Sequence, residues 1–446
     1  MDWIGWNWSS DGWVLAAGAL SAVAAALLGN FLVLRRMSML GDAISHAVLP
    51  GLAAAFLITG ARTSLPMFIG AALVGLLTAV FTEWIRGFGK VDEGASMGVV
   101  FTSLFALGLV MIVQAADHVD LDPSCVLYGS LETVAVAVLI GDTWNVLGLD
   151  VPRTVGIAAI NVLVNAAFLL LFYKELKISS FDPALATTAG YSARLMHYAL
   201  MTLVAVTAVV SFESMGNILV VAMFVVPPAA AYLLTDRLRW MIVLSVLLAV
   251  GSAALGHLGS IALPQALGMD DPSIAASIAV AAGLLFVLAA LFGPQHGWLV
   301  RFVRHRALAR GILAEDVIAY LYRREERDPQ AAVRLAELRS ELLSGPVMTR
   351  VVLALQRLRG MIVRSGGGYR LTSLGREQAK GLVRSHRLWE SYLASEAGVS
   401  ADRIHQSAER LEHFTDRRLR ARLDEETLTP VTDPHGRPIP EEGSSR

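Results

Sequence analysis

The sequence is poor in cysteine and in charged residues, and each shortage excludes a class of protein. Cys125 is the single cysteine among 446 residues, which excludes an intrachain disulfide framework and a thiolate-based metal site. Only 17% of the residues are charged, whereas soluble domains are nearer about a quarter. The chain also lacks the GxxxxGK[ST] phosphate loop, so we do not expect it to hydrolyse ATP itself. Its first residues have no basic segment, so we expect no cleaved signal peptide.

The charge is unevenly distributed and divides the chain into two parts. Residues 1–300 contain 11 Lys and Arg against 18 Asp and Glu, whereas residues 301–446 contain 26 against 20. Because the whole chain is 55% hydrophobic, the first part is predicted to be an all-α polytopic membrane domain. The second is predicted to be a hydrophilic, mildly basic domain.

About nine stretches approach the roughly 20 apolar residues that a membrane-spanning helix needs. They are Trp13–Leu34, Ala43–Thr59, Leu65–Ile85, Ala95–Ala115, Val155–Tyr173, Ala193–Ser211, Gly216–Leu234, Met241–Leu258 and Ile274–Leu291. A shorter run, Cys125–Ile140, is interrupted by Gly129 and Ser130, so we expect an interfacial or half-spanning helix there. Arg and Lys collect in alternate loops, which predicts an outer N-terminus and a cytoplasmic C-terminal domain.

Asp42 and His46 are an ionisable pair in Met37–Leu52, the segment that lies between two apolar runs. Four residues apart, they share one face of a helix and can reach one small ligand. Such groups at membrane depth usually face a pathway or a partner, and a carboxylate with an imidazole suits Mn, Fe or Zn. A capping Asp and a structural His would give the same spacing.

A short helix is predicted in the loop that follows Tyr173. Asp182 can cap it, Pro183 suits its first turn and Gly190 can end it. Such a helix can dock on a partner, or it can be an ordinary surface helix.

The hydrophilic part combines a winged-helix pattern with a set of potential metal ligands. Two predicted helices in Ala331–Met361 are followed by Ser365–Gly375, which is predicted to be a Gly-rich hairpin wing followed by a helix cap. The potential ligands are His and Glu at helical spacings: His386, Glu390, His405, Glu409, Glu412 and His413. Nitrogen and oxygen ligands without sulfur suit Mn(II), Fe(II) or Zn(II). Exposed pairs of charged side chains would give the same pattern.

The membrane part resembles the permease subunits of the manganese/zinc/iron ABC transporter family. The matching segments are LRRMSMLGDAISHAVLPG, VDEGASMGVVFTSLFALGLV, VDLDPSCVLYGSLE, SFDPALATTAG and SFESMGNILVVAMFVVPPAAA. The resemblance implies a multi-pass permease of a bacterial plasma membrane. Its implied partners are a separate ABC ATPase, an extracytoplasmic metal-binding protein and a second permease subunit, identical or paralogous. It places Asp42 and His46 in the translocation pathway. It also implies that Phe181–Gly190 is the helix that docks on the ATPase. The residues of this segment to which it gives a coupling role are Phe181, Asp182, Pro183 and Gly190.

The hydrophilic part resembles the iron- and manganese-dependent repressors related to the diphtheria toxin repressor. LTSLGREQA, VRSHRLWESYL, RIHQSAERLEH and DPHGRPIP occur in that family's order. The resemblance implies a linker and winged-helix domain over 301–380, and a helical metal-binding and dimerisation domain with a tail over 381–446. It gives ligand roles to the six His and Glu residues named above. Asp316 can add a ligand, but Ala319 stands where a ligating side chain is often found.

The leading hypothesis is a permease subunit that imports a divalent transition metal, with manganese favoured and zinc or iron as other candidates. The metal is then both substrate and effector, and this chain binds no nucleotide. The basic segment after Leu299 can contact lipid headgroups, or it can simply mark the end of the last span. The alternative is a membrane-tethered, metal-dependent transcription regulator. The turn LLSGPVMTR departs from the usual helix–turn–helix pattern, which argues against DNA binding.

Overall fold

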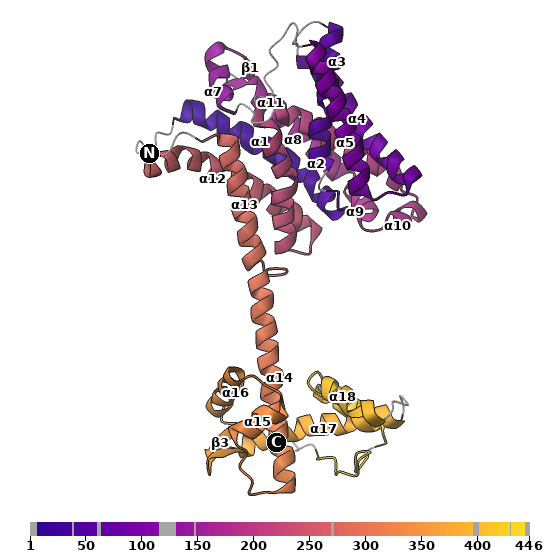
Figure 1. The fold of residues 1–446 in the computed structure, drawn as a ribbon, viewed down its shortest axis with the longest axis vertical. Helices are drawn as coiled ribbons and strands as arrows, with labels where there is room; N and C mark the ends of the chain where they lie inside the picture. Colours follow the sequence, from indigo (N-terminus) through magenta and orange to yellow (C-terminus); the bar gives the residue numbers. More distant parts are fainter. Residues whose placement is uncertain are drawn as a thin grey trace. The chain divides into compact units, whose positions relative to one another are not determined.

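The computed structural model describes residues 7–37, 40–59, 64–115, 131–146, 149–268, 272–395, 401–428 and 430–441. It divides into two compact units, Met1–Val300 and Arg301–Arg446 (Figure 1).

The first unit is helical, with one short hairpin. Its helices are α1 (Trp8–Leu34), α2 (Leu40–Ala47), α3 (Leu49–Thr59), α4 (Ser64–Gly89), α5 (Glu93–Ala115), α7 (Leu131–Ile140), α8 (Arg153–Leu171), α9 (Tyr173–Phe181), α10 (Pro183–Thr188), α11 (Ala193–Leu234), α12 (Leu238–Leu267) and α13 (Ile274–Phe292). The hairpin pairs β1 (Thr143–Val146) with β2 (Leu149–Pro152) in antiparallel register, with Thr143 opposite Pro152.

Within the described residues, eight helical segments are long and apolar enough to cross a membrane, so the chain is a multi-pass membrane protein. Two of the eight lie in α11, which breaks at Gly216, where φ is 73°. The stretch predicted as a further span, Ala43–Thr59, is divided instead between α2 and α3. Pro50 explains the break, because it has no N–H to bond the carbonyl four residues earlier. Of the run Cys125–Ile140, the described part is α7; Cys125, Gly129 and Ser130 lie outside it.

Helix α1 is central to the packing of the first unit. In its apolar 18-residue segment 72% of the residues are buried, whereas the buried share is 22–50% in the other seven spans. It packs against α8, α11 and α12. Outer helices expose apolar side chains instead, such as Leu163 and Leu170 on α8 and Val280 on α13. This pattern suits helices that face lipid.

The second unit begins three residues into α14 (Trp298–Arg327). Its other elements are α15 (Leu335–Glu341), α16 (Pro346–Leu358), β3 (Ile362–Ser365), β4 (Gly368–Leu371), α17 (Ser373–Ser395), α18 (Ala401–Glu412) and α19 (Arg417–Glu426). This order confirms the predicted winged-helix pattern. Gly366 and Gly367 both have positive φ, 58° and 77°, which a tight two-residue hairpin turn requires. The hydroxyl of Thr372 accepts the N–H of Gly375 at 3.1 Å and starts α17.

Candidate transport and metal-binding sites

Asp42 and His46 lie one turn apart on α2, a helix whose backbone packs against α5 and α11. The neighbouring Gly41 and Ile44 are buried. The side chains of Asp42 and His46 lie outside the described part of the structure, so their role as ligands in a translocation pathway stays a prediction.

The short helix predicted after Tyr173 is present as α10. The Oδ1 atom of Asp182 accepts the N–H of Leu185 at 2.9 Å, and Pro183 occupies the first turn. Gly190 has a φ of 86° and ends the segment. Phe181 at the end of α9 and Leu185 on α10 are 64% and 56% exposed, so this segment presents apolar side chains at its surface.

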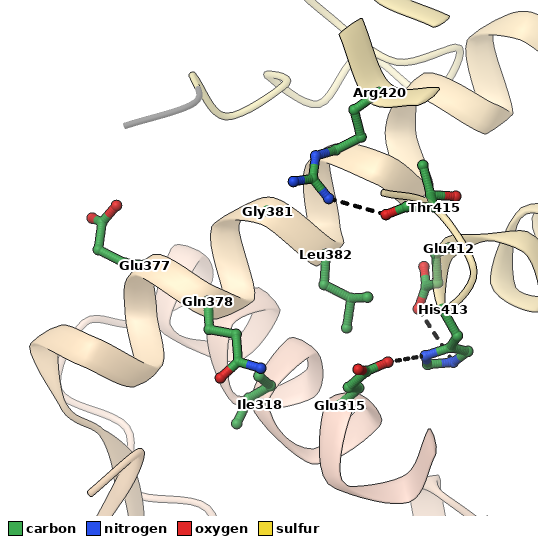
Figure 2. A pocket seen from close by; sticks show the side chains of 10 residues that line it. All are labelled: Glu315, Ile318, Glu377, Gln378, Gly381, Leu382, Glu412, His413, Thr415 and Arg420. Atoms are coloured by element: carbon green, nitrogen blue, oxygen red, sulfur yellow. Dashed lines mark hydrogen bonds and ion pairs between the residues drawn. The ribbon is translucent and has the colours of Figure 1, made fainter. Parts of the chain in front are cut away.

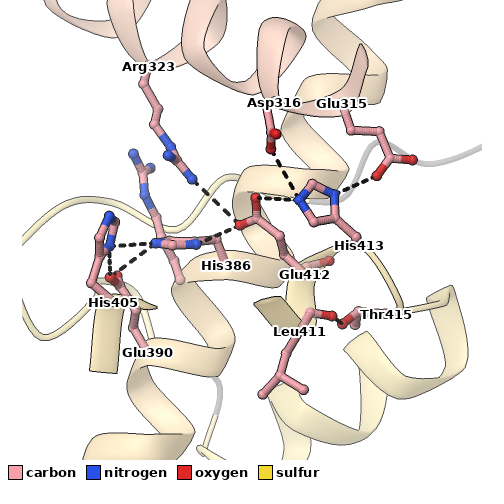
Figure 3. A network of polar contacts seen from close by, with 12 residues as sticks. Glu315, Asp316, Arg323, His386, Glu390, His405, Leu411, Glu412, His413 and Thr415 are labelled. Atoms are coloured by element: carbon pink, nitrogen blue, oxygen red, sulfur yellow. Dashed lines mark hydrogen bonds and ion pairs between the residues drawn. The ribbon is translucent and has the colours of Figure 1, made fainter. Parts of the chain in front are cut away.

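Three of the predicted ligands in the second unit form a tight triangle of donor atoms (Figure 3). The Nε2 atom of His386 lies 3.1 Å from Oε1 of Glu390 and 3.0 Å from Nδ1 of His405, and the last two atoms are 2.8 Å apart. Ligand atoms held about 2.1 Å from one ion stand roughly 3.0–3.5 Å apart. We call these three residues cluster A; their spacing fits a single divalent ion.

A second group of donors, cluster B, adjoins the first and consists of Asp316, Glu412 and His413. The Nε2 atom of His413 lies 3.1 Å from Oδ1 of Asp316 and 3.9 Å from Oε1 of Glu412. Glu412 also faces cluster A, because its Oε2 atom lies 2.6 Å from Nδ1 of His386 (Figure 3). One buried carboxylate therefore stands between the two clusters.

Burial and charge act against each other at these residues. Burial lowers the pKa of His386, but the carboxylates of Glu390 and Glu412 outweigh it and leave this pKa above its ordinary value. Burial also opposes ionisation of Glu390, yet hydrogen bonds from His386 and His405 lower its pKa to about 2. Burial lowers the pKa of His413, but hydrogen bonds to Asp316 and Glu315 bring it to about 10. The clusters therefore favour positive charge, and a bound metal would replace these protons.

Three acidic or imidazole side chains around the clusters were not assigned from the sequence. Oε2 of Glu315 lies 2.7 Å from Nδ1 of His413, and Nδ1 of His435 lies 3.7 Å from Oε2 of Glu390. Asp433 joins Glu390 and His435 in a third group of donors. Two features of the sequence could have indicated these side chains. The acidic pair Glu315–Asp316 pointed to Glu315, and the DPHG segment pointed to Asp433 and His435.

Three positions singled out in the sequence lie around cluster B. Asp316 supplies a carboxylate, as expected, whereas Ala319 is 2% exposed and contributes no ligand atom. Glu409 is exposed and lies in none of the three donor groups, so its ligand role stays a prediction. It lines a cavity of about 580 Å³ together with Asp316 and His413.

A further cavity, of about 290 Å³, opens beside His413 (Figure 2). Glu315 and Glu412 reach toward His413 from two sides, and Arg420 donates to the carbonyl of Thr415 at 3.2 Å. The cavities give a small cation access to cluster B from solvent.

The membrane part matches a known family over most of its length. The sequence profile of the ABC 3 transport family covers residues 12–293, including α2 and α10. The chain belongs to this family. It is therefore a permease subunit and not itself an enzyme, and ATP hydrolysis takes place on a separate subunit.

Several members of the family are closely similar to this chain. The manganese transport system membrane protein MntD of Bacillus subtilis (strain 168) is 41% identical over 297 residues, which are 66% of this chain and 96% of that protein. The zinc transport system membrane protein TroD of Treponema pallidum (strain Nichols) is 37% identical over 367 residues, 81% of this chain and 96% of that protein. The solved structure of PsaBC from Streptococcus pneumoniae in complex with Fab is 30% identical with a TM-score of 0.50, covering 65% of this chain and 93% of that one.

A second profile matches the hydrophilic part. The iron dependent repressor metal binding and dimerisation domain covers residues 372–441. This range includes α17, α18 and α19, and therefore every member of clusters A and B except Asp316 on α14. The predicted resemblance to metal-dependent repressors is confirmed.

Proposed function

We propose that this chain imports a divalent transition metal across a bacterial plasma membrane and that its second unit, on the cytoplasmic side, senses the imported metal. The proposal rests on one observation: the same chain contains an ABC 3 permease and a repressor-like metal-binding domain. The same kind of ligand, carboxylate plus imidazole, occurs in both parts: Asp42 with His46, and clusters A and B.

Manganese is the favoured substrate, with zinc and iron as the other candidates. The relatives compared above are named for manganese and zinc transport. Oxygen and nitrogen donors without sulfur accept all three metals, so the choice among them depends on geometry and supply.

Transport is proposed to follow alternating access. A separate ATPase docks on α10 and the end of α9 through the exposed Leu185 and Phe181, and an extracytoplasmic metal-binding protein delivers the ion. A second permease subunit, identical or paralogous, completes the pathway. ATP-driven closure then exposes Asp42 and His46 to each side of the membrane in turn.

Sensing is proposed to occur at clusters A and B, whose donor set and spacing suit a divalent ion. His386, Glu390 and His405 would hold one ion, and Asp316, Glu412 and His413 a second. Because Glu412 lies against both clusters, occupancy of one changes the charge that the other faces. Metal binding in a replete cell is then expected to slow transport.

Membrane lipid is a further proposed partner. Arg301, Arg304, Arg306 and Arg310 lie in the first half of α14, and Arg301 follows the end of the last span, Phe292, by nine residues. Juxtamembrane basic segments are attracted to anionic lipid at about 1 kcal/mol per cation. Replacing the four arginines with glutamine should weaken copurification of anionic phospholipid; equal lipid retention would contradict this contact.

A tethered transcription regulator is the second candidate. The hairpin β3–β4 completes a winged-helix shape, and the exposed Arg350 and Arg357 of α16 are available for contacts with phosphates. Metal-dependent, sequence-specific DNA binding by the full chain would support this candidate. If the chain binds no DNA, transport remains as the proposed function.

The test of transport is competitive uptake of manganese, zinc and iron by cells that express the chain with its ATPase. The double variant Asp42→Ala/His46→Ala is expected to lose uptake of the substrate metal. Asp150→Ala, at an exposed carboxylate on β2, is the matched control and should transport normally. Undiminished uptake by a well-expressed double variant would remove these residues from the pathway.

The test of sensing uses vesicles loaded internally with manganese or left empty. Wild-type uptake should slow when the metal is inside, and His413→Ala should abolish the slowing without changing uptake into empty vesicles. His305→Ala, at an exposed histidine of α14, serves as the control. Equal slowing of His413→Ala and the wild type, or no slowing of either, would refute a sensor at cluster B.

A further inference from the structure

Arg35 makes contacts that link distant parts of the membrane unit. It directly follows α1, and its guanidinium donates from Nε to the hydroxyl of Ser180 at 3.0 Å and from NH2 to that of Ser179 at 2.9 Å. Both serines belong to the last turn of α9. A guanidinium presents its donors in a rigid planar fork, so two parallel hydrogen bonds fix its orientation as well as its distance.

The two segments joined by Arg35 are those to which the proposed function gives the main roles. On one side, Ser179 and Ser180 stand three and two residues before Asp182, the residue that caps α10. On the other side, Arg35 stands five residues before Leu40, the first residue of the helix that carries Asp42 and His46. Arg36 has a φ of 62° and Met37 is 5% exposed, so the chain turns directly after Arg35 and is buried again at Met37.

The contacts of Arg35 extend to two more helices. Its NH1 atom lies 3.5 Å from Nδ1 of His197 on α11, and Nε2 of the same ring lies 3.7 Å from Oε2 of Glu83 on α4. Glu83 in turn accepts a hydrogen bond from Arg86 at 2.9 Å. Because arginine can only donate, Nδ1 of His197 must accept and Nε2 carries the hydrogen toward Glu83. One polar chain therefore connects α1, α4, α9 and α11.

From these contacts we infer that Arg35 is a positioning residue that transmits movement of the ATPase-docking helix to the metal pathway. A displacement of α10 moves the last turn of α9, to which it is covalently joined. The guanidinium fork carries that displacement to the end of α1 and so to α2. The inference rests on the proposed function, since it takes α10 as the docking helix and α2 as the carrier of the pathway ligands.

A purely structural role for Arg35 makes a different prediction. If the guanidinium only stabilises the fold, its loss should lower the amount of assembled transporter, with metal uptake and ATP hydrolysis reduced in proportion. If it transmits movement, its loss should separate the two activities. The ratio of metal ions transported to ATP hydrolysed is therefore the decisive quantity.

The experiment compares Arg35→Gln with Arg36→Gln in proteoliposomes that contain the complete transporter and its metal-binding protein. Both variants remove one positive charge from the same loop, so they affect membrane topology equally, but the side chain of Arg36 is exposed and that of Arg35 is partly buried. Manganese uptake and ATP hydrolysis are measured on the same sample. Arg35→Gln should lower uptake about tenfold while ATP hydrolysis stays within about twofold, since hydrogen bonds to charged groups are the stronger class. Arg36→Gln should leave both activities unchanged.

A second variant covers the case in which Arg35→Gln does not assemble. Ser179→Ala/Ser180→Ala removes the acceptors without changing any charge and should also lower the ratio of uptake to hydrolysis. In the triple variant the effects should not add, because all three side chains form one interaction. A wild-type ratio in both variants, or uptake and hydrolysis that fall in proportion, would overturn the inference. Failure of the proposed function is distinguishable, because wild-type proteoliposomes would then take up no metal.

Discussion

The side chains of the second unit show how buried charge is compensated at the scale of single residues. Arg387 is 2% exposed and lies 2.6 Å from Oε2 of Glu326 on α14 and 3.6 Å from Oδ2 of Asp433 in the tail. A buried ion pair contributes little net stability, but removing one partner costs about 3–5 kcal/mol because a charge is left uncompensated. These pairs therefore hold α17 in register with α14 and with the tail that carries His435.

One prediction at this scale concerns the metal stoichiometry of the full chain in detergent. Glu390→Gln removes a buried carboxylate of cluster A and should lower manganese binding by one equivalent per chain, while cluster B still binds. Titration calorimetry followed by metal analysis measures the change. Glu377→Gln, on the same helix but with a 56% exposed side chain, should bind as the wild type does. Unchanged stoichiometry in Glu390→Gln would exclude cluster A as a metal site.

At the scale of elements, glycine permits the close contacts around the helix pair α2–α3. A Cβ atom at Gly51 would lie 2.3 Å from the carbonyl oxygen of Gly70, so α3 and α4 meet backbone to backbone. A Cβ atom at Gly41 would lie 3.3 Å from the ring of Phe224 on α11. Packing between small residues is the usual means by which helices associate in lipid, and here it sets the position of the helix with Asp42 and His46.

The packing of α5 against α3 yields a second prediction. In Gly108→Ala the new Cβ atom would lie 2.8 Å from Leu49 and Pro50, so α3 or α5 must shift. Overpacking of this kind costs about 1–3 kcal/mol, and thermal unfolding of the detergent-solubilised chain should begin at a lower temperature. Gly98→Ala, on the same helix with no atom within 4 Å of the new Cβ, should be neutral or slightly stabilising. Equal melting temperatures for the two variants would contradict the close contact.

The surface of α10 yields a third prediction. Leu185→Ala removes most of an exposed apolar side chain and should reduce copurification of the ATPase with the permease by about tenfold, as loss of an anchoring contact does. Thr187→Ala, also exposed on α10, should retain the ATPase. Full retention by Leu185→Ala would place the docking surface elsewhere.

At the scale of the whole molecule, two family models match separate parts of the chain, residues 12–293 and 372–441. The match to MntD covers 96% of that protein but only 66% of this chain. The two compact units divide at Val300 and Arg301. We therefore expect transport to reside in the first unit and its regulation in the second.

A chain that ends after residue 300 tests this division. With the ATPase and the metal-binding protein it should take up manganese at the wild-type rate into empty vesicles, and internal manganese should no longer slow it. Adding a chelator inside vesicles of the full-length protein should give the same unregulated rate. Loss of uptake by a truncated chain that still copurifies with the ATPase would show that the second unit takes part in transport itself.

Local patterns in the sequence were enough to predict most elements of this protein. Apolar runs identified the spans, because a helix in lipid must be apolar over its full length. Asp182, Pro183 and Gly190 identified α10, and four-residue spacing placed His386 beside Glu390, because capping and helical periodicity depend on near neighbours alone. Pro50 was the local signal that Ala43–Thr59 would divide into two helices.

Tertiary structure decided which distant side chains meet. Glu412 lies against His386, and Glu315 and Asp316 reach His413 from a helix almost a hundred residues earlier in the chain. Arg35 reaches Ser179 and Ser180 in the same way. The sequence contains no local trace of these contacts, because they depend on how helices pack and not on spacing along the chain. The elements and the ligand types were thus determined by the sequence alone, whereas the two clusters and the link at Arg35 arise only from packing.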